Sequence, residues 1–98
     1  MKAIKRTSEF ARWFDRLRDK GAQQRIAIAI TRVANGHGVT KSVGGKVREI
    51  KLTYGPGYRV YYTERGGEMI VLLIGGDKSS QAADIAKAKE IVKELFDA

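Results

Sequence analysis

Three cationic side chains stand at positions from which they can act together on a phosphate. In the segment 47–52, VREIKL, apolar and polar residues alternate, which puts Glu49 and Lys51 on one face of a strand. A YGPG turn leads to a second alternating segment that begins near Arg59. If this turn pairs the two strands tightly, Lys51 and Arg59 share a face, and Lys78 joins them from the end of the next strand. The spacing therefore predicts a cluster of three cations.

Such a cluster suits the cleavage of RNA. When a 2′-hydroxyl attacks the adjacent phosphate, the pentavalent transition state carries two negative charges, and Lys or Arg donors stabilise them as they develop. Tyr61 is a candidate for stacking on a base or donating to a phosphate, and Glu49 for accepting a proton. Alternation alone leaves open which face of the second strand is exposed. A structural alternative also stays open, in which Lys51 and Arg59 merely pair across strands with Glu49 and Glu64.

Three further features favour structural roles. The run GGDKSS at 75–80 lies between a strand and a helix, but it does not match GxxxxGK[ST], which excludes a nucleoside triphosphatase of that type. We interpret it as a glycine-permitted turn with Ser79 or Ser80 as the helix cap, from which Lys78 can still contact a phosphate. His37 lies between glycines and is expected to be exposed rather than a general base. Trp13 and Phe14 fit the buried stripe of a helix.

Composition narrows the possible chemistry. The 98 residues fit one domain, 1–98, and include no cysteine and one histidine. These counts exclude thiolate zinc sites, multi-histidine metal sites and Cys-His hydrolases, so we expect no metal and no cofactor. The longest apolar run, 69–74, is too short to cross a bilayer, and the N-terminus lacks a secretory signal. The expected location is the cytoplasm, without membrane contact.

Charge is the strongest compositional signal. The chain has 19 Lys and Arg against 11 Asp and Glu, a formal net charge of +8. Residues 1–50 carry 12 of the basic and 4 of the acidic groups, whereas residues 51–98 carry 7 of each. An excess this large on a small domain favours a nucleic acid or an acidic protein as partner. Predicted RNA-binding residues are Arg48, Lys46, Arg12 and Arg16.

The elements that must position these residues follow an order β-α-α-β-β-β-α. Residues 2–6 suit an edge strand, and 37–45 a polar loop that can lead into a strand. Periodicity predicts a helix over 8–19, with Ser8 as its cap. Gly21 interrupts this pattern, a second helix then runs to about Asn35, and a third follows Ser79 or Ser80. Strands are predicted over 47–52, 58–64 and 69–76. The continuous apolar run of the last strand implies a central place in the sheet. This is an α+β fold, a helical hairpin followed by an antiparallel-rich meander and a C-terminal helix, with one sheet face under helices and the other partly open.

The chain also resembles a known family. The runs REIKLTYGPGYRVYYTERGG and MIVLLIGGDKSSQAADIAKAKEIVKEL, with the basic helical hairpin before them, are similar to the phage Gp49-like or HigB-like "addiction module killer protein" branch of the RelE/ParE superfamily. The likeness covers essentially the whole chain. GPGYRVYY followed by GGDKSSQ forms the specific part of the signature.

This resemblance implies a RelE-like domain and the toxin of a type II toxin–antitoxin system. The implied activity is metal-independent, ribosome-dependent endonucleolytic cleavage of mRNA. The implied partners are the ribosome, mRNA and a cognate antitoxin, expected to carry a helix-turn-helix DNA-binding domain. Lys51, Arg59 and Lys78 fall where the family has basic residues. Glu49 occupies a position that is acidic in this branch and basic in RelE, and the region around Asp84 lacks the tyrosine that RelE uses near its C-terminus.

Two other functional classes stay open. ParE relatives share the fold but inhibit DNA gyrase by binding protein, and the retention of Lys51, Arg59 and Lys78 favours the nuclease over that alternative. A nucleic-acid-binding module without catalysis is the third interpretation, for which the charge alone would suffice.

Overall fold

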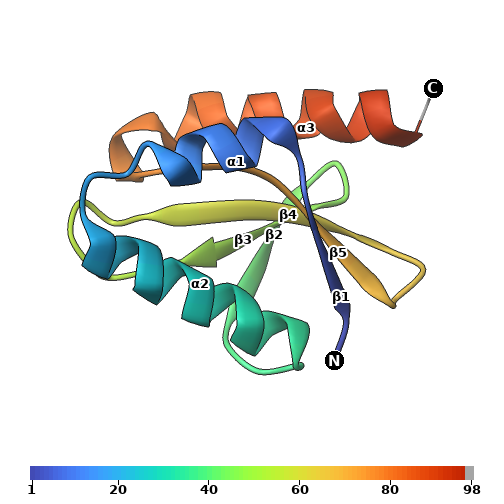
Figure 1. Cartoon of the computed structure of the whole chain (residues 1–98). Coiled ribbons are helices and arrows are strands. Elements are labelled where there is room, and N and C mark those ends of the chain that lie inside the picture. Colours follow the sequence, from blue (N-terminus) through green and yellow to red (C-terminus); the bar gives the residue numbers. More distant parts are fainter. Residues whose placement is uncertain (97–98) are drawn as a thin grey trace.

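A five-stranded sheet forms the centre of the chain, and the computed structural model describes residues 1–96 (Figure 1). The elements follow in the order β1 (Ala3–Arg6), α1 (Ser8–Asp15), α2 (Lys20–Ala34), β2 (Thr40–Gly44), β3 (Val47–Lys51), β4 (Arg59–Arg65), β5 (Met69–Gly76), a 3-10 turn η1 (Lys78–Ser80) and α3 (Gln81–Phe96). The strand order is β1-β5-β4-β3-β2, with β1 parallel to β5 and the other pairs antiparallel. The predicted α+β class is confirmed.

Helices cover both faces of this sheet. In Figure 1, α1 and α2 lie in front of the strands, and α3 runs behind α1. The apolar run of β5 serves both layers, because Ile70 and Leu72 pack with α1 and α2 while Val71 and Leu73 pack with α3. This confirms the interior position predicted for that strand. The second face is less open than expected, since α3 covers its middle.

One strand and several element ends differ from the predictions. Residues 40–44 form the edge strand β2 inside the segment interpreted as a loop. The first helix ends at Asp15 instead of residue 19, and it is capped by Thr7, whose hydroxyl oxygen accepts from the Phe10 amide at 3.1 Å. The reason for the early end is Asp19, whose carboxylate caps the next helix and so requires extended backbone there.

Asp19 also ties α2 to the turn between β3 and β4. Its Oδ1 accepts from the Ala22 amide at 3.1 Å, and its Oδ2 accepts from the Tyr54 hydroxyl at 2.9 Å. The Arg25 guanidinium lies 4.4 Å from the centre of the Tyr54 ring. Gly21, predicted as the break before the helix, instead lies in its first turn, where a Cβ would come within 3.1 Å of Asp19 Oδ1 and 3.3 Å of Tyr54 Oη. The glycine leaves room for this link.

Within residues 1–96, none of the helices combines the length and hydropathy needed to span a membrane. The α3 layer begins only at Gln81, so the end of the sheet where β3 stops and β4 starts has Lys51 exposed. The three predicted cations, Lys51, Arg59 and Lys78, lie at that end of the sheet.

Candidate functional site

The three predicted cations come together at the turn between β3 and β4. Lys51 and Arg59 are directly opposite each other in the antiparallel ladder, so their side chains leave the same face. A Cβ built on Gly57 would lie 3.5 Å from both Arg59 Nη1 and Lys78 Cβ, which places Lys78 against the same turn. Lys51 and Lys78 are exposed, whereas Arg59 is only 5% exposed. The predicted sharing of a face is confirmed, and it is the face covered farther along by α3.

Glu49 is the centre of a buried polar network beside these cations. Its Oε2 accepts from the Tyr61 hydroxyl at 3.0 Å and from Gln81 Nε2 at 3.0 Å, and Arg59 Nε lies 3.7 Å from the same oxygen. Glu49 is 4% exposed and the Tyr61 ring is fully buried. Burial is the larger cause, and the hydrogen bond to Glu49 the second, of a Tyr61 pKa well above its usual range. Tyr61 therefore stays a protonated donor, and the Glu49 carboxylate accepts two hydrogen bonds and faces one guanidinium.

Arg59 uses its three nitrogens differently. Nη1 donates to the Gly57 carbonyl at 2.9 Å. Nε is fully buried without a hydrogen bond, and the nearby Glu49 carboxylate offsets its charge. Nη2 has no hydrogen-bond partner among residues 1–96, yet it is not among the fully buried atoms. The side chain is thus anchored through Nη1, while Nη2 is left without a hydrogen-bond partner among residues 1–96.

The segment 75–80 is built around Asp77, not around the serines predicted as caps. Asp77 Oδ1 accepts from the Ser79 amide at 2.8 Å and from the Ser79 hydroxyl, while Ser80 Oγ completes a capping box. The Ser79 hydrogen bonds lower the pKa of the Asp77 carboxyl. Because Asp77 already occupies the first amides, Lys78 is the part of this segment available to a phosphate.

The glycines before Asp77 allow close packing instead of a turn. Both belong to β5, and neither has a positive φ. A Cβ on Gly75 would collide with the Trp13 ring, and one on Gly76 would collide with the Asp84 carboxylate, which accepts from Ser80 Oγ. Trp13 and Phe14 pack against the core, as predicted, and His37 is exposed, as predicted.

An Asp84→Asn variant is expected to change how stability depends on pH. Burial raises the pKa of Asp84 above 3.8, partly opposed by the Ser80 hydrogen bond. The folded protein therefore holds this proton more tightly than the unfolded chain, so the Asp84 contribution to stability falls as pH rises through the window above 3.8. Asn keeps an acceptor for Ser80 but does not titrate. Melting temperatures measured from pH 3.5 to 7 should show the variant gaining on wild type as pH rises, and parallel curves would contradict this assignment.

The predicted RNA-binding residues lie outside the three-cation cluster. Arg48 points to the opposite face, where its Nε and Nη2 donate to Thr40 Oγ1 at 3.1 and 2.9 Å. Lys46 lies in the turn between β2 and β3. Arg12 and Arg16 line a groove of about 500 Å³ with Lys87 of α3. Their roles stay predictions.

Gln81 and Gly57 are the site residues that the sequence analysis did not single out. Gln81 reaches Glu49 from a position 32 residues later, and only its place in the GGDKSSQ run could have pointed to it. Gly57 supplies the carbonyl that anchors Arg59. Within residues 1–96, no group of three or more His, Asp or Glu is placed to hold a metal ion.

Comparison with known proteins agrees with the Gp49-like resemblance seen in the motifs. Residues 10–96 match the family described as phage-derived protein Gp49-like (DUF891). An uncharacterized protein of Haemophilus influenzae is 40% identical over 93 residues, which cover 94% of each chain. The family match spans strands β2 to β5, helices α2 and α3 and the whole cation cluster. The chain belongs to the phage-derived Gp49-like family.

Proposed function

We propose that this protein is the toxin of a type II toxin–antitoxin system, a RelE/ParE-superfamily endoribonuclease that cleaves mRNA on the ribosome. One observation carries the proposal. Lys51 and Arg59 are direct partners in the ladder, and Lys78 lies against the same turn, so two exposed lysines flank the buried arginine at one end of the sheet. Membership in the Gp49-like family supports the same assignment.

The proposed reaction is a transesterification within the message. The 2′-oxygen forms a bond to phosphorus as its proton passes to solvent water, the bond from phosphorus to the 5′-oxygen breaks, and that oxygen takes up a proton from solvent water. The products are a 2′,3′-cyclic phosphate and a 5′-hydroxyl. Arg59 Nη2, Lys51 and Lys78 donate to the phosphate oxygens, whose charge increases in the transition state. The cations perform this role without a metal ion.

Glu49 and Tyr61 take positioning roles in this proposal. Tyr61 and Gln81 hold Glu49, and Glu49 faces the Nε side of Arg59 while Gly57 anchors Nη1. Fixing the guanidinium in advance spares the reaction the cost of ordering a flexible side chain. In the free chain the Tyr61 ring is fully buried, so stacking on a base at this position would require α3 to move.

The proposed partners follow from the family and the charge. A type II toxin requires a cognate antitoxin, for which we propose a protein with a helix-turn-helix DNA-binding domain. The net charge of +8 suits both an acidic protein partner and the RNA of the ribosome. Action on translating ribosomes places the protein in the cytoplasm.

Mapping mRNA 5′ ends in a translating extract tests the function. We expect new 5′ ends only on ribosome-bound messages when wild-type protein is added. A DNA supercoiling assay runs in parallel, because a gyrase-binding protein of the same fold would block supercoiling and leave messages intact. That second pattern would overturn the nuclease assignment.

A further inference from the structure

A second cationic groove lies at the other end of α3. It has a volume of about 310 Å³ and is lined by Gly45, Lys46, Lys89, Val92, Lys93 and Phe96. Three of these six residues are lysines and none is acidic. We call it the hairpin groove, because the turn between β2 and β3 forms one wall and the last turns of α3 form the other.

The backbone of the turn is shaped to bring a lysine into this groove. Gly44, Gly45 and Lys46 have φ values of 90°, 59° and 64°, and Lys46 is the only non-glycine residue with positive φ among residues 1–96. A left-handed conformation is unfavourable for a side chain such as lysine and needs a compensating reason. A Cβ on Gly45 would lie 3.0 Å from Lys89 Cγ, so the glycine also lets the Lys89 stem pack across the turn.

The positive charges in the groove repel one another. Lys89 and Lys93 are four residues apart on one side of α3, a spacing at which like charges destabilise a helix. Lys46 Nζ lies 5.7 Å and the Arg65 guanidinium 4.6 Å from the centre of the Phe96 ring, which adds a fourth cation at the rim. No salt bridge among residues 1–96 involves any of these four cations, and the one pair within α3 joins Lys87 to Glu90.

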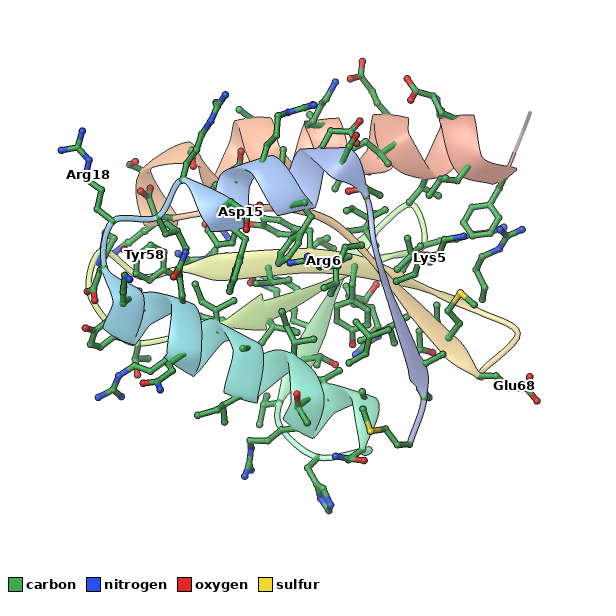
Figure 2. The ribbon with its side chains drawn as sticks, viewed as in Figure 1. Lys5, Arg6, Asp15, Arg18, Tyr58 and Glu68 are labelled. Atoms are coloured by element: carbon green, nitrogen blue, oxygen red, sulfur yellow. The ribbon has the colours of Figure 1, made fainter. Side chains whose placement is uncertain are left out.

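The two cationic sites lie at opposite ends of the sheet on the face covered by α3. Figure 2 shows Tyr58, next to the first site, and Glu68, in the turn after β4, at opposite ends of the molecule. Lys51 and Lys46 are separated by five residues of the same chain segment, a distance of about 16 Å at roughly 3.3 Å per strand residue. At roughly 3.4 Å per nucleotide, the spacing along one strand of B-form DNA, about five nucleotides cover this span.

We propose that the hairpin groove binds the sugar-phosphate backbone of RNA as a second site, separate from the cation cluster at Lys51, Arg59 and Lys78. The lysine amines suit regularly spaced phosphates, which bind point charges, while Val92, Phe96 and the Lys89 stem against the turn form the groove that presents them. The inference deepens the proposed function and rests on it, because it gives the RNA engaged at the first site a second contact along α3.

Fluorescence anisotropy with a labelled 12-nucleotide single-stranded RNA tests the groove. In 50 mM salt, the Lys89→Ala/Lys93→Ala variant should bind about tenfold more weakly than wild type, and the slope of log K against log salt should flatten by about 1.4, or roughly 0.7 per phosphate contact. The matched control is Lys20→Ala/Arg32→Ala, which removes two exposed cations from α2 on the opposite face. The control should stay within twofold of wild type. A groove variant indistinguishable from the control would overturn the proposal and favour an acidic protein as the occupant.

A Lys46→Gly variant separates binding from folding. Glycine adopts the left-handed conformation without strain, so the melting temperature should stay the same or rise while RNA binding weakens about threefold. Weaker binding accompanied by a lower melting temperature would instead indicate a structural role and count against the groove.

Two further measurements show which form of RNA binds and separate this inference from the proposed function. A 12-base-pair duplex RNA run beside the single strand shows which form the groove prefers, and loss of affinity in the Lys89→Ala/Lys93→Ala variant for either form supports the site. Wild-type cleavage of messages in the extract, with no effect of the groove variants on RNA binding, would sink this inference and leave the proposed function standing. Weakened RNA binding without any cleavage by wild type would do the reverse.

Discussion

An Arg59→Ala variant is expected to lose growth inhibition and to cleave messages about 10²–10³-fold more slowly than wild type. Arg59 supplies the one guanidinium of the cluster, and its free Nη2 is the donor that the network around it orients. Growth of cells expressing the variant, together with 5′-end mapping in extract, measures the effect. Arg32→Ala, which removes an exposed arginine from α2, should keep full activity and serves as the control.

Folding must be separated from catalysis in this experiment. Removing Arg59 leaves the buried Glu49 carboxylate with two donors, Tyr61 and Gln81, so we expect a loss of stability without unfolding. The Glu49→Gln/Arg59→Ala variant removes both charges and should recover stability but not activity. Arg59→Lys keeps the charge without the planar fork and should also be impaired. A folded Arg59→Ala protein that still arrests growth would show that the cation cluster is not the active site.

Gly75→Ala is expected to cause the largest loss of stability. A methyl group there collides with the Trp13 ring, which packs between α1 and the sheet, and neither group can move without disturbing the core. Overpacking of this kind costs about 2–3 kcal/mol, which corresponds to a melting temperature lower by roughly 10–20 °C in a domain of this size. Thermal melts followed by circular dichroism measure it.

The partner of this collision can be tested directly. If the Trp13 ring is the obstacle, a Trp13→Leu/Gly75→Ala protein should lose less stability than the two single changes added together. Strict additivity would mean that Gly75 is required for another reason, such as its backbone conformation.

Local patterns predicted most of the site because period-two alternation persists across a short turn. Glu49 faces Tyr61 and Lys51 faces Arg59 in the observed register, as the alternation indicates once the strands are paired. The depth of Arg59 did not follow from sequence, because it depends on where α3 begins and on Gln81.

The remaining differences have the same physical origin. The strand β2 could not be predicted from the sequence pattern, because it is an edge strand that lacks an apolar face. Only Thr40 and Val43 are half-buried in it. The role of Gly75 depends on Trp13, about sixty residues earlier in the chain. Contacts between distant segments leave no local period, and these are the contacts that decide which side chains become buried.

The pairing of β1 with β5 has a consequence for the order of events during synthesis. Ala3 pairs with Met69 and Arg6 with Leu72, so the first strand waits without its partner until most of the chain has left the ribosome. Lys78 and Gln81 emerge later still, and without them the arginine has neither its neighbouring lysine nor the amide that holds Glu49. A nascent chain therefore cannot complete the surroundings of Arg59 before residues 78–81 have been made.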